Sequence, residues 1–344
     1  MTDLVRIGVL GAGSIGCYVG GKLLAASAAD VTLVGRARLG DEIATHGLTV
    51  KDMGRPPVTV PAERVRFQTG TDALSRCDVV LCCVKSAHTT AVTRSLDDAL
   101  PREALVVSLQ NGVRNVEVLR TGLSGRRIAG GVVSFNVVSA GGGLFHRATS
   151  GPLILETAGE PRAGGFVRAL RAAGLDVEER ANLAPDQWTK LLVNLNNAVS
   201  ALSGVPTRQM LLSPRFRRIV AALVDEAIRV LRAGRIPTAR FRGVPVGWMP
   251  YLLRLPTPIV RLVTAAQLRI DPEARSSMWE DLARGRPTEV DFLNGEIVRL
   301  AERVHVDAPF NRRIVKLVHA AERAGGSPGL DATALWSKLS GAAL

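Results

Sequence analysis

The stretch "WTKLLVNLNN" at residues 188–197 places one amine and two amides at a spacing that suits a polar ligand. If residues 185–203 form one helix, at about 100° per residue, Lys190, Asn194 and Asn197 lie within about 60° of one another. Leucines and valines occupy the other side of this helix. A stripe facing bulk water would mix Glu, Lys and Arg, whereas amides with a single amine suit a partly enclosed site that orients a polar ligand. The alternative is a solvated stripe on an ordinary helix.

Residues 276–302, "SSMWEDLARGRPTEVDFLNGEIVRLAE", form a second concentration of polar side chains. Thr288 and Asp291 have the spacing of a variant capping box, which predicts that a helix begins at residue 288. Glu289 would then lie in the first turn, where a carboxylate complements the helix dipole. This capping role and a ligand-binding role are both consistent with Glu289.

A glycine motif, "GAGSIG", follows the first predicted strand directly. The strand is "VRIGVL" at 5–10, and a helical pattern begins at residue 17, so the glycines stand at the strand-to-helix turn of a βαβ unit. Such a turn brings backbone N–H groups to a pyrophosphate at a helix N-terminus. The motif predicts dinucleotide binding, with a purely structural turn as the alternative. The residues concerned are Gly11, Ala12, Gly13, Ser14, Ile15 and Gly16.

The end of the second predicted strand, 30–36, indicates which dinucleotide binds. It reads "LVGRARLG", with Arg36 and Arg38 and no carboxylate before Asp41. An acidic residue there would hold the ribose 2′-OH of NAD, whereas arginine can pair with the 2′-phosphate of NADP. The sequence therefore favours NADP, unless both arginines are ordinary surface residues.

Two further polar residues follow predicted strands. Lys85 comes after "CDVVLCCVK" at 77–85, and Asn111 lies at the end of "ALVVSLQNG" at 104–112. Open α/β sheets bind ligands outside the carboxyl ends of their strands. Both residues are therefore expected at the ligand edge of the sheet.

The expected secondary structure, which must position these residues, changes near residue 182 from alternating strands and helices to helices alone. The N-terminal part alternates strands and helices, and its continuous apolar strands, including "IAGGVVSFNVV" at 128–138, predict a parallel sheet covered on both faces. Beyond the change, helical patterns dominate. The prediction is an α/β protein with a Rossmann-type dinucleotide-binding domain at 1–182 and an all-α domain at 183–344. The helices are expected at 185–203, 213–233, 258–269, 273–283, 288–304 and 309–323.

Composition narrows the choice of partners. The chain has 344 residues, 47% of them hydrophobic, and a formal net charge of +13, which favours anionic ligands. The arginines are scattered among apolar and acidic residues, and no dense basic run is interleaved with aromatics, so nucleic-acid binding is not expected. The expected partner is a small molecule.

The cysteines and the apolar segments indicate a cytoplasmic protein. Four cysteines stand within residues 17–83 without C-x-x-C or histidine at metal-ligand spacing, a pattern that suits reduced thiols and no metal. Residues 244–264 come nearest to a membrane span but contain two arginines and two prolines in their second half. This segment is interpreted as a helical hairpin packed on the core or at an oligomer interface, with peripheral membrane contact as the alternative.

Taken together, the motifs resemble the ketopantoate reductase (2-dehydropantoate 2-reductase) family from Gly8 to about Asn311. The resemblance depends on the order of seven stretches: "GAGSIG", "CVKSAH", "LQNGVRN", "WTKLLVN", "SSMWEDL", "RPTEVDFLNGEIV" and "HVDAPFN". It implies a Rossmann domain followed by a helical domain, an active site in the cleft between them, and NADPH-dependent reduction of ketopantoate to pantoate on the route to pantothenate and coenzyme A. A homodimer is compatible with it.

The resemblance also assigns roles to individual residues. Lys190 would be the proton donor. The substrate would be held by Asn111, Asn194, Asn197 and Ser277. The cofactor would be bordered by the glycine loop, Arg36, Lys85, Asn111, Val137 and Glu289. An ammonium can stabilise the negative charge that grows on a carbonyl oxygen as hydride adds, and then protonate it. A cationic neighbour would lower the pKa of that lysine, and Lys85 is expected to be this neighbour if the cleft closes.

Two departures from the family pattern concern the substrate. The two asparagines of the helix are three residues apart, where the family commonly has four, and Ala198 occupies the fourth position. Residues 239–269 are also longer and more apolar than is usual. Two alternatives therefore remain: a reductase of another 2-oxo acid or a related hydroxy-acid dehydrogenase on the same fold, and a non-catalytic NADP-binding regulator.

Overall fold

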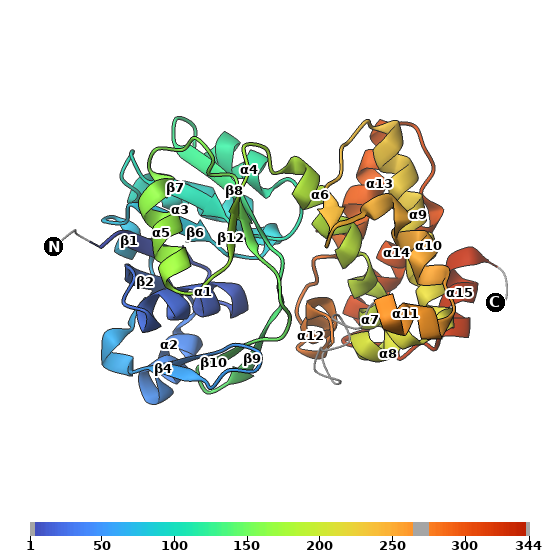
Figure 1. Ribbon diagram of the computed structural model, residues 1–344, viewed down its shortest axis with the longest axis horizontal. Helices are drawn as coiled ribbons and strands as arrows, with labels where there is room; N and C mark the ends of the chain where they lie inside the picture. The colour runs from blue at the N-terminus through green and yellow to red at the C-terminus, as the bar shows by residue number, and fades with distance from the viewer. Residues whose placement is uncertain (1–3, 264–274, 342–344) are drawn as a thin grey trace. The chain divides into compact units, whose positions relative to one another are not determined.

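The computed structural model describes residues 4–263 and 275–341 and divides into two compact units, Met1–Leu183 and Ala184–Leu344 (Figure 1). The division falls one residue beyond the expected boundary. Leu183 belongs to the first unit because it packs in a small apolar cluster with Val132 and Ile154. Among the described residues, no helix combines the length and the hydropathy needed to cross a bilayer.

The first unit is built on an eight-stranded sheet in the order β12-β11-β8-β7-β6-β1-β2-β5. The six neighbouring strands β8, β7, β6, β1, β2 and β5 run parallel to one another. Strand β11 runs antiparallel to β8, and β12 is parallel to β11. Because β1 lies between β2 and β6, the strand order reverses at β1, as in a dinucleotide-binding fold. This sheet confirms the predicted Rossmann-type architecture. Its strands are β1 (Arg6–Leu10), β2 (Asp30–Val34), β5 (Arg66–Gln68), β6 (Val79–Cys82), β7 (Leu105–Ser108), β8 (Arg127–Val133), β11 (Leu153–Leu155) and β12 (Val177–Glu179).

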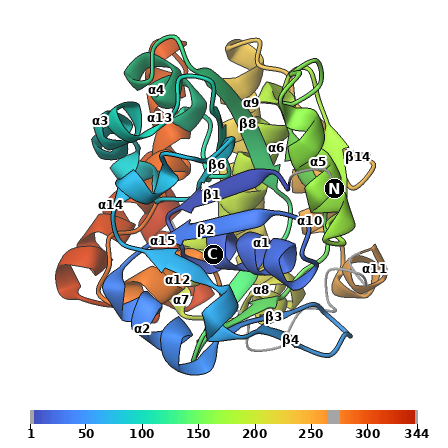
Figure 2. The same cartoon turned by 90° about the vertical axis from the view of Figure 1, so that its left-hand side faces the viewer.

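Helices cover both faces of this sheet, which explains why its strands are apolar without alternation. Figure 2 shows α1 and α5 on one side and α3 and α4 on the other. The same division appears along single strands: Ile7 and Val9 pack in the cluster under α1, whereas Leu10 packs in the cluster under α3. The helices of this unit are α1 (Ser14–Ala25), α2 (Ala37–His46), α3 (Thr89–Ala99), α4 (Asn115–Gly122) and α5 (Ala163–Ala172).

The prediction of one strand at 128–138 is wrong. Strand β8 ends at Val133, and β9 (Val137–Gly141) belongs to a second, four-stranded sheet in the order β4-β3-β10-β9. The chain leaves the first sheet because Phe135 turns into the core, where its ring packs edge-on to that of Tyr18 at 5.6 Å between centroids. The sequence did not predict this second sheet. Its other strands are β3 (Leu48–Lys51), β4 (Val58–Val60) and β10 (Leu144–Arg147).

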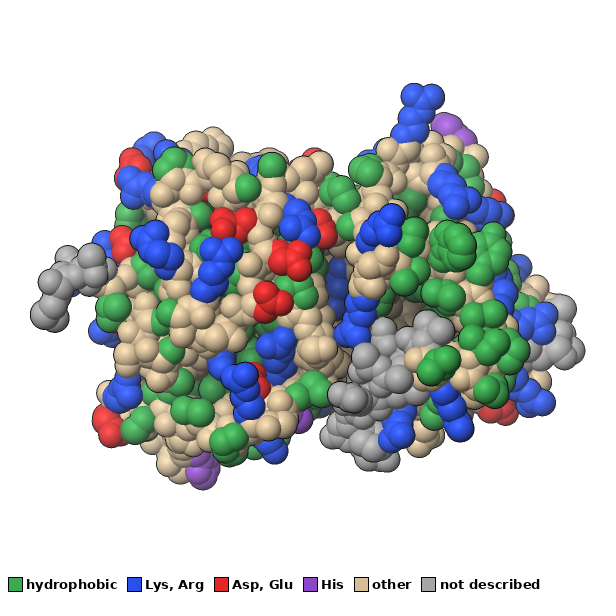
Figure 3. Space-filling view, viewed as in Figure 1, with side chains coloured by type: hydrophobic (Ala, Val, Ile, Leu, Met, Phe, Trp, Pro, Cys, Tyr) green, Lys and Arg blue, Asp and Glu red, His purple; other side chains and the backbone are tan. Residues whose placement is uncertain are grey.

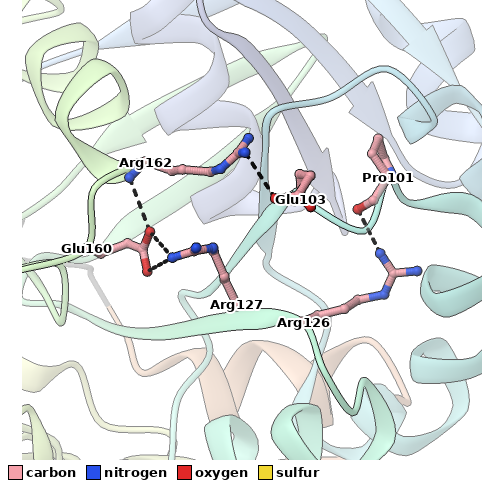
Figure 4. Close-up of polar contacts among 6 residues, drawn as sticks. All are labelled: Pro101, Glu103, Arg126, Arg127, Glu160 and Arg162. Atoms are coloured by element: carbon pink, nitrogen blue, oxygen red, sulfur yellow. Dashed lines mark hydrogen bonds and ion pairs between the residues drawn. The ribbon is translucent and has the colours of Figure 1, made fainter.

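Arginine–carboxylate pairs occupy the amino edge of the large sheet. Figure 4 shows Arg127, the first residue of β8, with its guanidinium 3.0 Å from the carboxylate of Glu160. Arg162 donates to Glu103 at 3.0 Å, and Arg126 donates to the carbonyl oxygen of Pro101 at 2.7 Å. Part of the basic composition is thus used in structural contacts at the edge opposite the glycine loop.

The second unit is helical, with a small hairpin, and its first helix differs from the prediction. The expected helix 185–203 is two helices, because the chain tightens at Leu195, whose N–H reaches the carbonyl of Leu192 at 3.4 Å. The predicted helices 258–269 and 273–283 extend into residues outside the described range. The observed helices are α6 (Ala184–Asn194), α7 (Asn196–Ser203), α8 (Thr207–Leu212), α9 (Pro214–Ala233), α10 (Met249–Arg254), α11 (Thr257–Val263), α12 (Ser277–Ala283), α13 (Asn294–Arg303), α14 (Pro309–Ala324) and α15 (Ala332–Ser340).

A buried arginine organises α8, which the sequence did not predict, and α10, which lies in the segment 244–264 that was expected to form a helical hairpin. The side chain of Arg217 on α9 is 2% exposed, and its guanidinium donates to the carbonyl oxygens of Leu211, Leu253 and Leu255 at 3.0 Å each. These carbonyls lie at the C-terminal ends of short helices, where backbone acceptors lack intrahelical partners. Arg217 therefore supplies the donors that let these helix ends pack against α9.

Candidate active site

The turn after β1 is held in place by backbone contacts on two sides. The N–H groups of Gly11 and Ala12 donate to the carbonyl oxygen of Val34, at 3.0 and 2.9 Å. Gly11 has a φ of +89°, and a Cβ on it would lie 2.6 Å from the backbone nitrogen of Val84 in the loop after β6. The turn therefore requires glycine at this position, and it joins β1 to both of its neighbours at the point where the strand order reverses.

The N-terminus of α1 presents free space and unused donors beside this turn. The first α-helical hydrogen bond runs from the N–H of Cys17 to Gly13 at 2.8 Å, so the N–H groups of Ser14, Ile15 and Gly16 precede it and have no earlier helical turn to bond to. A Cβ on Gly13 would meet nothing closer than 3.9 Å, whereas one on Gly16 would lie 2.7 Å from the carbonyl oxygen of Gly11. This cradle fits a pyrophosphate, because it offers helix-terminal donors and leaves Gly13 open to an approaching ligand.

Arg36 and Arg38 differ in what their guanidinium groups contact. Arg38 is 83% exposed and forms an ion pair with Glu42 on the same helix. Arg36 stands at the N-cap position of α2 and is exposed, and within 4–263 and 275–341 its guanidinium has no hydrogen bond or ion pair. Of the two arginines, Arg36 is therefore the one with its donors available to an anion.

A buried polar network locks the loops that carry Lys85 and Asn111. The side-chain amide of Asn115 donates to Ser86 Oγ at 3.0 Å and to the carbonyl oxygen of Asn111 at 2.5 Å, and it accepts from Thr89 at 2.8 Å. Gln110 extends the network by donating to the carbonyl oxygen of Val84 and to Thr89, at 3.0 and 2.7 Å. These positioning residues were not predicted, although Ser86, Gln110 and Asn115 lie within the quoted stretches "CVKSAH" and "LQNGVRN". Lys85 and Asn111, both half-buried, stand on loops that the network holds at the carboxyl ends of β6 and β7.

Val137 lies where the first unit changes sheets. It is the first residue of β9, is 7% exposed, and pairs with Arg147 on β10. The preceding loop is fixed by the N–H of Asn136, which donates to Thr149 Oγ1 at 2.8 Å. Val137 is therefore a rigid, apolar element of the segment that follows β8.

The side-chain amine of Lys190, on α6, is not paired with a carboxylate of the described residues. Its side chain is half-buried, and with the described residues it makes no hydrogen bond or ion pair. Burial, and then the charge of Arg242, lower the pKa of Lys190 from 10.5 to about 8. Within its own unit the cationic neighbour is thus Arg242, which was not among the predicted site residues.

Arg242 comes close to α6 because a hairpin is bound to that helix. Strands β13 (Arg240–Phe241) and β14 (Val244–Pro245) flank a two-residue turn in which Arg242 and Gly243 have φ values of 51° and 81°, the pattern of a type I′ turn. Thr189 Oγ1 accepts from the N–H of Ala239 at 2.9 Å and donates to the carbonyl oxygen of Ala239 at 3.2 Å. Because Thr189 precedes Lys190, this pair of bonds places the base of the hairpin beside the lysine.

The two asparagines predicted to bind substrate lie on different helices. Asn194 is the last residue of α6 and is 9% exposed, and Asn197 lies in the first turn of α7 and is half-buried. Neither side-chain amide has a hydrogen-bond partner in the described part of the chain. The turn at Leu195 falls between them, so the angle calculated for one continuous helix does not apply to Asn197. Ala198, the residue at the family spacing, is fully buried in the core.

Ser277 is placed by its neighbour Ser276. Ser277 is the exposed first residue of α12, whereas Ser276 is 6% exposed and caps this helix by accepting from the N–H of Trp279 at 3.1 Å. Ser276 Oγ also donates to the carbonyl oxygen of Asn197, at 3.1 Å. This bond ties the start of α12 to α7. The dipeptide Ser-Ser was a visible helix-capping signal, but the sequence did not indicate which serine caps.

The structure contradicts the predicted capping box around Glu289. Thr288 Oγ1 accepts from the N–H of Val290 at 3.3 Å, within a short 3₁₀ turn, and α13 begins only at Asn294. Asp291 does not reach back to the helix start, because it pairs with Nε2 of His319 at 3.0 Å. Glu289 is consequently a half-buried residue at the start of the 3₁₀ turn, and a role at the dipole of α13 does not explain it.

In the described residues, no group of three or more histidine, cysteine, aspartate or glutamate side chains is placed to hold a metal ion. The four cysteines are free thiols, and burial raises the pKa of Cys77 to about 11 and that of Cys82 to about 12.

Both units match models of a single protein family. Residues 7–160 match the model described as ketopantoate reductase PanE/ApbA, and residues 182–322 match that of the ketopantoate reductase PanE/ApbA C terminal. The 2-dehydropantoate 2-reductase of Pyrococcus horikoshii is 30% identical over 94% of this chain and 99% of its own.

Solved structures agree with the family models. A PanE/ApbA family ketopantoate reductase from Ralstonia eutropha JMP134 superimposes with a TM-score of 0.77 at 29% identity, over 93% of this chain and 99% of that one. A D-mandelate dehydrogenase in a ternary structure with NADH and anilino(oxo)acetate shares the fold, with a TM-score of 0.76 at 20% identity over 93% of this chain and 99% of that one. With a glycine cradle in one unit, an amine flanked by amides in the other and family matches across both, the chain belongs to the ketopantoate reductase family.

Proposed function

We propose that this chain reduces 2-dehydropantoate to pantoate with NADPH and that Lys190 is the proton donor. The observation that carries the proposal is that the side chains of Lys190, Asn194 and Asn197 lack hydrogen-bond partners within the described residues although they are buried or half-buried. Buried polar groups are normally satisfied inside a protein, so a set without internal partners indicates groups reserved for a ligand. Family membership supports the identity of that ligand.

The chemistry needs a group that can hold and release one proton near neutral pH. Bound NADPH would supply the hydride to C2 of the oxo acid. As the C–H bond forms, the electron pair of the carbonyl moves to its oxygen, and the ammonium of Lys190 stabilises this charge and transfers its proton to give the hydroxyl. A pKa of about 8 leaves Lys190 mostly protonated at neutral pH, yet makes it a much stronger acid than an ordinary lysine.

The remaining site residues divide between substrate and cofactor. We assign Asn111, Asn194, Asn197 and Ser277 to the polar groups of the substrate. We assign the cofactor to Gly11, Ala12, Gly13, Ser14, Ile15, Gly16, Arg36, Lys85, Asn111, Val137 and Glu289. Gly11 and Ala12 use their own N–H groups to hold the turn, so the donors for the pyrophosphate would come from the start of α1.

The choice of NADPH over NADH is supported by Arg36. Its guanidinium is exposed at the end of β2 with no partner among the described residues, at the position where a dinucleotide fold meets the adenosine ribose. A planar guanidinium can bind a 2′-phosphate with two parallel hydrogen bonds. We also propose a cytoplasmic location, which the four free cysteines support.

A second candidate function is reduction of a different 2-oxo acid. Two observations favour it: Ala198 is buried where the family spacing would put an asparagine, and the hairpin with Arg242 lies beside Lys190. Either feature could change which substituent fits next to the reacting carbonyl.

A substrate panel distinguishes the two candidates. NADPH oxidation is measured with ketopantoate, 2-oxoisovalerate and pyruvate, and kcat/KM is compared. The proposal predicts the highest kcat/KM for ketopantoate, because its hydroxymethyl group would hydrogen-bond to the amides and a pocket that binds a hydroxyl discriminates strongly against analogues lacking it. Equal or better turnover of 2-oxoisovalerate would support the second candidate. If no oxo acid oxidises NADPH while the cofactor binds, the chain is a non-catalytic NADP-binding protein.

A further inference from the structure

Exposed apolar side chains are concentrated on one short segment of the helical unit. Among the described residues, eight large hydrophobic side chains are exposed, and five of them lie between residues 244 and 262. Figure 3 shows hydrophobic side chains gathered over α10 and α11. We define these five residues as the apolar surface: Val244 at 38%, Trp248 at 62%, Tyr251 at 66%, Ile259 at 45% and Leu262 at 80% exposed.

The charge of the same region has a single sign. Residues 227–263 contain seven arginines and no aspartate, glutamate, lysine or histidine. Of the two acids just before this region, Asp225 offsets one of these charges by pairing with Arg254 at 3.3 Å, and the buried Glu226 accepts from the backbone N–H groups of Phe310 and Asn311, at 2.9 and 2.8 Å. The segment that carries the apolar surface therefore contributes a net positive charge.

The surface is preorganised. Arg217 holds the C-terminal end of α10 through the carbonyl oxygens of Leu253 and Leu255, and it donates to Thr257 Oγ1 at the start of α11 at 3.2 Å. These bonds hold the junction between α10, which carries Tyr251, and α11, which carries Leu262. Ordering this segment on a partner would thus cost little conformational entropy.

Exposed aromatic side chains together with arginines suit binding to an anionic bilayer better than binding to another protein. Tryptophan and tyrosine are the residues enriched where a protein meets the headgroup region, because one part of the ring is apolar and the other polar. Arginines around them add attraction to acidic lipids. A second copy of this chain would bring the same arginines face to face, and like charges oppose such an interface.

We propose that the apolar surface docks on a bilayer containing anionic phospholipid, with Trp248 and Tyr251 in the interfacial layer and the surrounding arginines on the headgroups. The protein is then a peripheral membrane protein, held by its helical unit, and this docking is independent of the proposed reductase activity.

Vesicle co-sedimentation tests this proposal with the full chain. Wild type is mixed with phosphatidylglycerol/phosphatidylcholine vesicles or with phosphatidylcholine vesicles alone, at low and high salt. The test variant is Trp248→Ser/Tyr251→Ser. The matched control is Met53→Ser/Val58→Ser, which removes two exposed apolar side chains from the other unit. Thermal unfolding and NADPH oxidation verify that each variant is folded.

The expected result is salt-sensitive binding of wild type to the anionic vesicles, weaker binding to phosphatidylcholine alone, and a partition coefficient at least about tenfold lower for Trp248→Ser/Tyr251→Ser. The control variant should bind as wild type does. Absence of binding, or equal binding by the test variant, would overturn the proposal. So would a wild-type dimer in vesicle-free buffer that Trp248→Ser/Tyr251→Ser dissociates, since the surface would then bind a second copy.

Discussion

Lys190 and Arg242 are neighbouring cations, and after burial the charge of Arg242 is the second cause that lowers the pKa of Lys190 to about 8. The two residues are 52 positions apart, and the hydrogen bonds between Thr189 and Ala239 bring the hairpin of Arg242 to the helix of Lys190. The pKa of the proposed proton donor is thus lowered further by a second cation, which lies on a hairpin.

Arg242→Gln should move the pH profile of the reaction upward. Without the neighbouring charge the ammonium of Lys190 is more stable, so its pKa rises, and the alkaline fall of kcat/KM shifts to higher pH by up to about one unit. The measurement is kcat/KM for NADPH oxidation between pH 6 and about 10. Arg240→Gln is the control, because Arg240 lies on the same hairpin but donates to the carbonyl oxygen of Gly243 at 3.1 Å. Identical profiles for wild type and Arg242→Gln would contradict the assigned electrostatic role.

Replacement of Lys190 by methionine should stabilise the fold while abolishing activity. Lys190 binds its proton less well in the folded state than in the unfolded state, so its charge destabilises the fold. This destabilisation is complete below pH 8, where both states are protonated, and disappears above the unfolded pKa of 10.5, where both are neutral. Allowing for partial exposure, we expect Lys190→Met to raise the free energy of unfolding by about 1–2 kcal/mol at pH 7 and by much less at pH 10. Urea denaturation at both pH values measures this difference. A gain independent of pH would show that packing, and not the charge, is responsible.

Gly13→Ala should weaken cofactor binding without destabilising the protein. Gly13 has a φ of −108°, which alanine accepts, and its new Cβ would meet no atom closer than 3.9 Å. The added methyl group would instead occupy the space proposed for the pyrophosphate. We expect an unchanged melting temperature and a Kd for NADPH raised at least about tenfold. Gly11→Ala is the contrasting variant, because its Cβ would lie 2.6 Å from the backbone of Val84 and the fold itself should lose stability. Unchanged NADPH affinity in Gly13→Ala would place the cofactor elsewhere.

Arg36→Asp should reduce the preference for NADPH over NADH. The carboxylate would repel the 2′-phosphate and could accept from the ribose 2′-OH, so the ratio of the two kcat/KM values should fall by at least about tenfold. Arg38→Asp is the matched control two residues away, since Arg38 is 83% exposed and already pairs with Glu42. A larger effect at residue 38 than at residue 36 would reverse the assignment.

The glycine loop and the large sheet could be predicted because their signals are local. Gly11 and Gly16 are required by contacts with the adjacent strand and loop, and the apolar strands follow from burial on both faces. The helical pattern around Lys190 was also visible, and so were the polar residues on it.

The predictions that were wrong depend on tertiary contacts between segments far apart in the sequence. Phe135 ends β8 because it packs on Tyr18, more than a hundred residues earlier, and a strand pattern alone does not show this. The turn at Leu195 divides a continuous helical pattern, and Asp291 binds His319 on α14 in place of the predicted cap. Arg242 looked like one more surface arginine, because its proximity to Lys190 depends on bonds between Thr189 and Ala239.

The measurement that tests the central claim most directly is the reduction of ketopantoate by Lys190→Ala, together with its affinity for NADPH. If Lys190 stabilises and protonates the developing oxyanion, kcat should fall by at least about 10²-fold while the Kd for NADPH changes less than about threefold. Asn196→Ala, which lies between the two assigned asparagines at the start of α7, controls for general disturbance and should retain activity close to that of wild type. A Lys190→Ala enzyme with a kcat near that of wild type would contradict the account, because another group would then have to donate the proton.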